Sequence, residues 1–96
     1  MNLQQKCVQI VETLDKKFDI KRDPHLSFTQ LMEEVGELAQ EINSEKLRNK
    51  KINYKNLQGE FADVIIQISI LAKMLDVDID EAVEKKIKVL EKRHNL

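Results

Sequence analysis

The chain has no tryptophan, one proline, two glycines and one cysteine among its 96 residues. So few glycines and prolines argue against a β protein, because the turns between strands favour these residues. A lone cysteine excludes an internal disulfide framework. Apolar neighbours at helical spacing predict that the Cys7 thiol is packed in a core and not reactive.

Neither sign of charge predominates, since 16 basic side chains stand against 17 acidic ones. Nucleic-acid-binding domains usually carry a basic excess, so we expect no nucleic-acid partner. The most apolar stretch, Val64 to Ala72, is interrupted by Gln67 and Ser69 and is far shorter than the roughly 20 residues of a membrane span. The first residues also lack an apolar run of signal-peptide length. We therefore expect a cytoplasmic protein with no membrane partner.

Apolar residues recur at helical spacing, and no segment alternates with the period of two that marks a strand. This pattern predicts four helices, over about residues 2–18, 27–48, 55–75 and 79–94. Ser27 with Gln30, and Asp78 with Glu81, have the spacing of capping boxes that begin the second and fourth helices. A chain this short is one domain by default. We therefore expect residues 1–96 to form a single all-α domain, an antiparallel four-helix bundle.

The third predicted helix is apolar around nearly its whole axis between Glu60 and Ala72. Such a helix is buried on most sides, and a small domain can bury it by packing against a second subunit. We therefore expect a homo-oligomer, either a dimer or a tetramer. Glu60, Asp63 and Gln67 nevertheless share an arc of about 60° on this helix. Buried acids are costly unless a basic side chain or a cation neutralises them.

The second predicted helix supplies a matching pair of acids. Glu34 and Glu37 are three residues apart, as are Glu60 and Asp63, so each pair projects from one face of its helix. Alone, the acids of the second helix are typical of a solvated face. If the two helices are antiparallel neighbours, however, the four carboxylates can converge.

Carboxylates without histidine or thiolate suit Mg²⁺, with Mn²⁺ as a substitute, better than Zn²⁺. Mg²⁺ usually completes its coordination with water and substrate phosphates. The acid pairs therefore indicate metal-assisted hydrolysis of a phosphate ester or anhydride.

Residues 84–93 at the end of the chain form a basic cluster, which includes Lys86 and Arg93. Cations near the end of a helix complement its dipole, and this purely structural interpretation stays open. The functional alternative is contact with a polyphosphate, because a metal ion neutralises only part of a triphosphate's charge.

At these acids the sequence resembles the MazG-like nucleotide pyrophosphohydrolases, which belong to the all-α nucleoside triphosphate pyrophosphohydrolases. The family pattern is E-E-x-x-E, a variable gap and E-x-x-D. Here it reads Glu33-Glu34-Val35-Gly36-Glu37, a gap of 22 residues, and Glu60-Phe61-Ala62-Asp63. The contexts EEVGELAQEI and GEFADVIIQI match as well, and the resemblance spans about residues 24–94.

The resemblance implies a Mg²⁺-dependent enzyme that cleaves a nucleoside triphosphate between its α and β phosphates, with release of a monophosphate and pyrophosphate. Clearing of non-standard nucleotides is the role it suggests. The metal ligands that it implies are Glu34, Glu37, Glu60 and Asp63. Glu33 would orient or deprotonate the attacking water, or support the metal ligands without touching the ion. Gln67 would face the nucleotide, and Lys86 and Arg93 would hold its phosphates.

Two alternatives to this triphosphate hydrolase stay open. The first is a non-enzymatic helical module that dimerises or binds a partner helix. The second is a related hydrolase that acts on another phosphoanhydride, such as phosphoribosyl-ATP. Mg²⁺ with nucleotide should stabilise an enzyme against heat, because ligands stabilise the state that binds them. A binding module would not respond.

Overall fold

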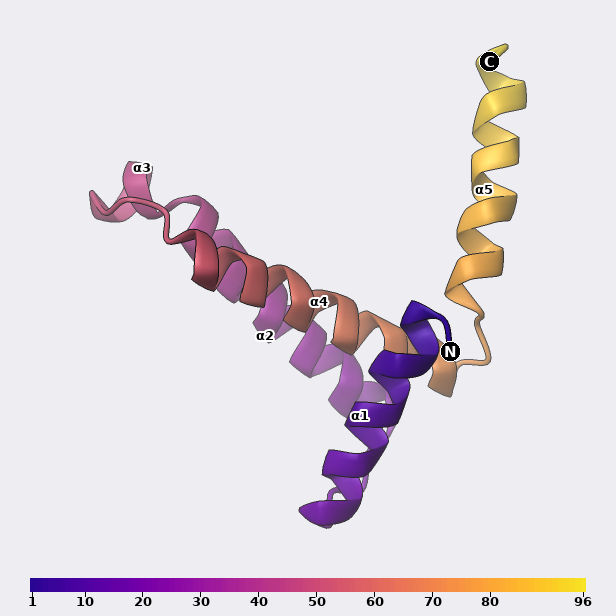
Figure 1. The fold of residues 1–96 in the computed structure, drawn as a ribbon, viewed down its shortest axis with the longest axis horizontal. Helices are drawn as coiled ribbons and strands as arrows, with labels where there is room; N and C mark the ends of the chain where they lie inside the picture. Colours follow the sequence, from indigo (N-terminus) through magenta and orange to yellow (C-terminus); the bar gives the residue numbers. More distant parts are fainter.

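The computed structural model describes residues 1–96 as five helices with no strand (Figure 1). The helices are α1 (Leu3–Lys17), α2 (Pro24–Ile42), α3 (Ser44–Arg48), α4 (Tyr54–Met74) and α5 (Ile79–Arg93). The all-helical fold expected from the apolar periodicity is confirmed. None of the helices combines the length and apolarity that crossing a bilayer requires.

α2 begins earlier than its sequence pattern predicts. Its N-cap is Asp23, whose side chain accepts a hydrogen bond from the Leu26 N–H at 2.8 Å, and Pro24 occupies the first turn. Proline suits this position because the first N–H groups of a helix have no intrahelical partner. The expected start at Ser27 is therefore wrong. The Ser27 hydroxyl is fully buried and lies 3.4 Å from the Met74 sulfur on α4, to which it donates.

α2 also ends earlier than expected, at Ile42, and a separate five-residue helix, α3, follows. Asn43 directs both its backbone and its side-chain N–H to the carbonyl of Ala39. Ser44 donates to the Gln40 carbonyl and to Glu41. Short polar side chains that bond to nearby backbone in this way compete with continued helix, and the predicted extension to residue 48 breaks at this point.

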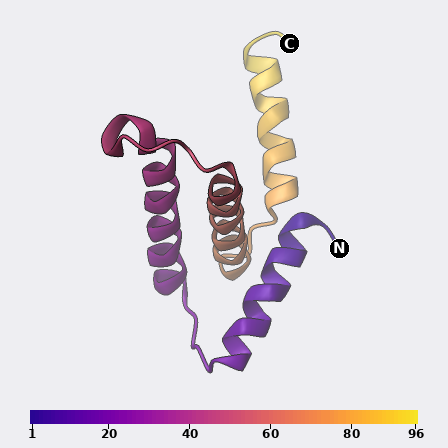
Figure 2. The same cartoon turned by 60° about the vertical axis from the view of Figure 1, so that its left-hand side comes forward.

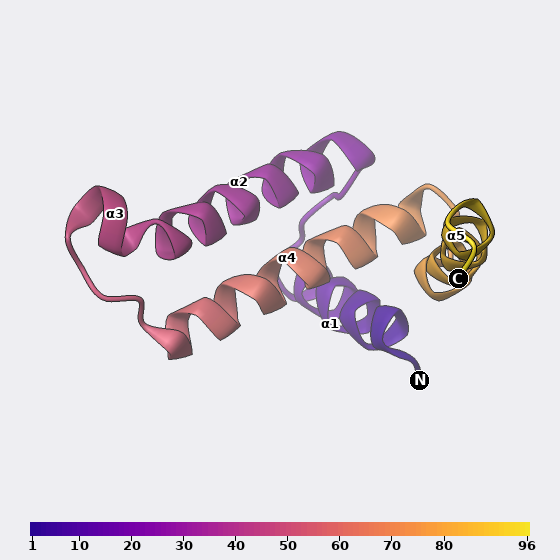
Figure 3. The same cartoon turned by 90° about the horizontal axis from the view of Figure 1, so that it is seen from above.

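The core lies where α1 packs on α4. Val8 and Val11 from α1 pack with Ile70 from α4, and Ile66 and Met74 border them. Cys7 is 7% exposed beside them, as expected for a packed thiol. α2 and α4 run antiparallel side by side, with α1 crossing α4 on the other side (Figure 3).

An ion pair joins the end of α1 to the start of α2, where the two helices meet in a V (Figure 2). Arg22 binds both carboxylate oxygens of Asp15, at 2.6 and 3.0 Å. The same guanidinium donates to Ser27 and Gln30. The two paired side chains are only 10% and 14% exposed, so Arg22, in the link between the helices, ties α1 to the first turns of α2 in a largely buried contact.

The expected four-helix bundle is not closed within one chain. α5 leaves the end of α4 and projects away from the other helices (Figures 1 and 2). It has no buried residue, and Val83 and Ile87 on its apolar side are both 50% exposed. The connection turns at Asp76, whose φ of 58° is left-handed, as is common where a helix ends. Three helices pack together, and the fourth long helix has no partner here.

Candidate metal centre

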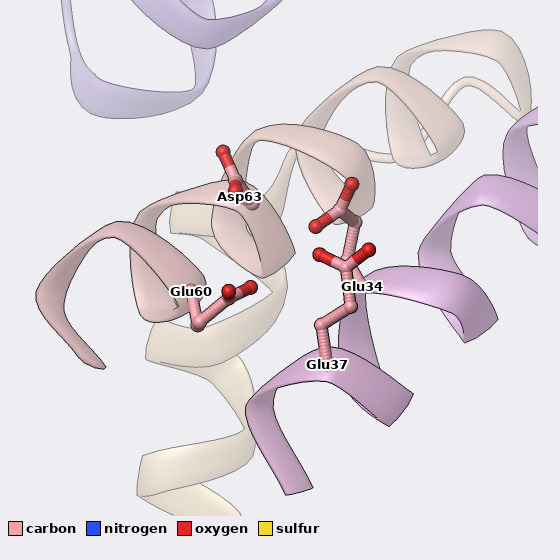
Figure 4. A group of neighbouring side chains, drawn as sticks. All are labelled: Glu34, Glu37, Glu60 and Asp63. Carbon is pink, nitrogen blue, oxygen red and sulfur yellow. The ribbon is translucent and has the colours of Figure 1, made fainter. Parts of the chain in front are cut away.

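Four carboxylates meet between α2 and α4. Glu34 and Glu37 from α2 face Glu60 and Asp63 from α4 across the space between the helices (Figure 4). One oxygen from each of the four side chains lies within 4.8 Å of the others. The i,i+3 spacing places each pair on one helical face, and the antiparallel packing turns the two faces toward each other. The convergence expected from the sequence is present within a single chain.

Two of these acids are partly buried, and each has one carboxylate oxygen without a hydrogen-bond partner. The Oε2 atoms of Glu34 and Glu60 are both buried and unpaired, as is Oε1 of Gln67 one turn further along α4. Glu37 and Asp63 are exposed. A buried polar oxygen without a partner carries the full cost of its lost hydration. A bound ion is one of the partners that satisfy such an atom, as an ordered water is.

The surroundings of Glu34 and Glu60 disfavour the ionised form of both carboxylates. The pKa of Glu34 is raised from its ordinary 4.5 to about 7, mainly by burial and next by the charges of Asp63 and Glu37. Burial likewise raises the pKa of Glu60, together with the charge of Glu37. Like charges at short range and loss of water both penalise ionised carboxylates.

No basic side chain neutralises this cluster. The ion pairs of the structure are Arg22–Asp15, Lys73–Glu12 and Lys85–Glu81, and none includes a carboxylate of the cluster. The interpretation in which a neighbouring lysine or arginine satisfies the acids is therefore wrong for this chain. A bound cation would offset the charge of these four clustered carboxylates.

The donor set fits a small divalent cation. All four groups are carboxylates, the hard oxygen ligands that Mg²⁺ and Mn²⁺ prefer. The largest oxygen–oxygen separation of 4.8 Å is slightly more than twice an Mg–O distance of about 2.0–2.1 Å. Small side-chain adjustments would bring these oxygens around one ion.

The other residues singled out in the sequence are placed differently. Glu33 is exposed on α2 and lies about 100° around the helix from Glu34, so it flanks the cluster without joining it. Gln67 follows Asp63 by one turn, and its Oε1 is buried and unpaired. Lys86 and Arg93 lie on α5, which the single chain holds away from the α2–α4 pair.

Glu41 is a further acid at this site that the sequence reasoning did not include among the site residues. It lies one turn beyond Glu37 on α2, its charge contributes to the raised pKa of Glu60, and it accepts a 2.8 Å hydrogen bond from Ser44. The i,i+4 spacing from Glu37 was the available signal, because residues at that spacing share a helical face.

The fold and the site together define a class: all-helical proteins that present two acid pairs, one from each of two antiparallel helices, to a shared space of cation size. The family model of the MazG nucleotide pyrophosphohydrolase domain matches residues 22–96. The chain therefore belongs to the MazG family, and the resemblance drawn from the acid spacing is confirmed. α1, at residues 3–17, lies outside the matched region.

A relative in Bacillus subtilis (strain 168), described as uncharacterized protein YpjD, is 36% identical over 62 residues. The match covers 62% of this chain and 56% of the relative, so the chain spans a little over half of the relative's length. No solved structure matches the chain.

Proposed function

We propose that the chain is a cytoplasmic, Mg²⁺-dependent nucleoside triphosphate pyrophosphohydrolase that acts on non-standard nucleotides. One observation carries the proposal: four carboxylates within 4.8 Å of one another, without a basic partner. Membership of the MazG family supports the reaction class.

In this proposal the chain's residues divide by task. The cation ligands are Glu34, Glu37, Glu60 and Asp63. When bound, the cation would offset charge on the phosphate oxygens and acidify a water molecule. Glu33, exposed beside the cluster, accepts the proton of the attacking water as its oxygen bonds to the α-phosphorus. The bond from the α-phosphorus to the bridging oxygen breaks, and the electron pair leaves with pyrophosphate.

Gln67 and the basic residues act on the substrate. The amide of Gln67 lies partly buried next to the acid pair of α4, and its unpaired Oε1 accepts a hydrogen bond from the nucleotide. Lys86 and Arg93 bind the β and γ phosphates, because cations at the leaving group stabilise charge that develops there.

The basic residues reach the site only if a second copy of the chain is present. α5 has no buried residue and a half-exposed apolar side, while α2 carries no lysine or arginine. The basic α5 of one subunit therefore complements the acidic face of another in charge. We propose a homodimer or homotetramer with shared sites, which light scattering during gel filtration would measure directly.

The proposal is tested by incubating the protein with Mg²⁺ and a panel of common and modified triphosphates in ¹⁸O-water, with products identified by ³¹P NMR and mass spectrometry. The expected products are a monophosphate carrying the ¹⁸O and unlabelled pyrophosphate. Label in pyrophosphate, or release of orthophosphate, would contradict attack at the α-phosphorus. A panel that includes phosphoribosyl-ATP separates the related hydrolase activities.

Site variants complete this test. Glu37→Gln and Asp63→Asn should each abolish pyrophosphate release while the helical circular dichroism is unchanged, because each removes one charged ligand. Glu45→Gln on α3 is the matched control and should retain activity. Full activity in both cluster variants would refute the proposed site.

The exposed apolar side of α5 also fits the second candidate, a helical interaction module without catalysis. Such a module would keep the melting temperature unchanged when Mg²⁺ and a triphosphate are added together.

A further inference from the structure

The link between α4 and α5 is held from outside by a single side chain of α1. The Gln4 Nε2 group donates to the Val77 carbonyl at 2.9 Å and approaches the Ser69 carbonyl at 3.4 Å. Its Oε1 accepts from the Ile79 N–H at 2.8 Å. One amide therefore bonds to backbone on both sides of Asp78, the residue that caps α5.

The amide group is matched to this backbone. Val77 presents a carbonyl and Ile79 an N–H, and a primary amide carries one donor group and one acceptor side by side. The Ile79 N–H belongs to the first turn of α5, where N–H groups have no acceptor within the helix. Its partner in this structure is Gln4.

Gln4 is itself held in place by the core. Cys7, Val8 and Val11 follow it at i+3, i+4 and i+7, so they share its helical face. All three are buried, and Val8 and Val11 pack against Ile70 of α4. Figure 1 shows the N-terminal end of α1 beside the α4–α5 connection. The hydrogen bonds of Gln4 to Val77 and Ile79, called the Gln4 clamp below, thus tie the first turn of α5 to the buried core between α1 and α4.

We infer that Gln4 is a positioning residue, which sets the direction in which α5 leaves the α1–α2–α4 body. The consequence for the site rests on the proposed function: by setting the direction of α5, Gln4 positions Lys86 and Arg93 to bind the substrate's phosphates. Gln4 lies outside residues 22–96, the part of the chain that the family model matches. α1 therefore contributes to the site through α5, without touching the substrate.

The test compares the wild-type protein with Gln4→Met, which keeps the side chain's length and helix propensity but has neither amide hydrogen bond. Amide hydrogen exchange measured by NMR should show the Ile79 N–H exchanging about tenfold faster in the variant. The Glu81 N–H, capped by Asp78 at 3.0 Å, should be unchanged. Gln9→Met, on an exposed position of α1, is the matched control. Equal Ile79 exchange in wild type and Gln4→Met would overturn the Gln4 clamp.

Residual dipolar couplings of α5 amides measure its direction independently of any activity. In the wild type they should fit the same alignment tensor as α4, and in Gln4→Met they should be reduced or fit a different one. Unchanged couplings would overturn the role of Gln4 in setting the direction of α5.

Kinetics then separate positioning from general stability. Gln4→Met should raise the KM for the Mg²⁺-triphosphate several-fold with a smaller change in kcat, while the Mg²⁺ affinity of the acid cluster is unchanged. An unchanged KM in a variant with altered couplings would overturn the link to the substrate. A wild-type protein without pyrophosphate release would instead refute the proposed function and this link with it, while the exchange and coupling measurements would still decide the direction of α5.

Discussion

Replacing Glu34 by glutamine should stabilise the metal-free protein, although it alters a residue of the proposed site. Glu34 shares a space with three other carboxylates, with oxygens no more than 4.8 Å apart. At that separation each pair of charges repels by about 1 kcal/mol even at the dielectric constant of water. Burial adds to this cost, since it is the largest cause of the raised pKa of Glu34.

Solvent screening reduces the repulsion, because two of the partners are exposed and pairs at a surface contribute about 0–1 kcal/mol each. We therefore expect Glu34→Gln to raise the free energy of unfolding by about 1 kcal/mol at pH 8 without metal. For a domain of this size that gain corresponds to a rise in Tm of about 4–8 °C. Thermal unfolding followed by circular dichroism, with EDTA present, measures it.

Mg²⁺ should reverse the order of the two proteins. A cation at about 100 times its Kd stabilises the state that binds it by about 2.7 kcal/mol, and the wild type should gain this stability while Glu34→Gln gains much less. Glu84→Gln, which removes the same charge from exposed α5, should change neither Tm nor its response to Mg²⁺. The reasoning would be refuted if metal-free Glu34→Gln were less stable than the wild type, or if Mg²⁺ raised its Tm as much as it raises that of the wild type.

Further predictions concern pH, the helix junction and the core. The folded protein keeps a proton on Glu34 up to about pH 7, whereas the unfolded chain releases it near pH 4.5. Without metal, the Tm should therefore decrease as the pH is raised from 4.5 to 7, because the folded state binds more protons in this range. Saturating Mg²⁺ should remove this decrease. Arg22→Ala should cost about 3 kcal/mol in urea unfolding, because it leaves the largely buried Asp15 carboxylate unpaired; a cost below that of Lys21→Ala would contradict the structural role. Ile70→Val should cost about 1 kcal/mol in the same assay, because Ile70 is 3% exposed in the core, and a neutral effect would place Ile70 outside it.

The acid pairs were the part of the site that the sequence predicted best. Glu34 with Glu37, and Glu60 with Asp63, are related by spacing within a helix, and that spacing determines the shared face wherever the helix packs. Only one further assumption, that the two helices are antiparallel neighbours, was needed to bring them together. The short connection between these helices made that assumption a natural one.

Helix ends and helix packing were harder to predict. Asp23 and Ser27 are both good N-cap residues, and the choice between them depends on a tertiary contact, since the Ser27 hydroxyl is buried against Met74. The direction of α5 depends on the left-handed turn at Asp76 and on the bonds to Gln4. Neither has a periodic signature, so the amphipathic pattern of α5 was assigned to a bundle within the chain.

The central physical claim is that the carboxylates of α2 and α4 together hold one divalent cation. Crystals grown with Mn²⁺ test it directly, because anomalous scattering locates the metal without reference to the protein atoms. We predict one strong peak per chain within coordination distance of oxygens of Glu34, Glu37, Glu60 and Asp63, and no peak in crystals of Asp63→Asn. A wild-type map without a peak between these helices, or with manganese bound elsewhere, would contradict the account.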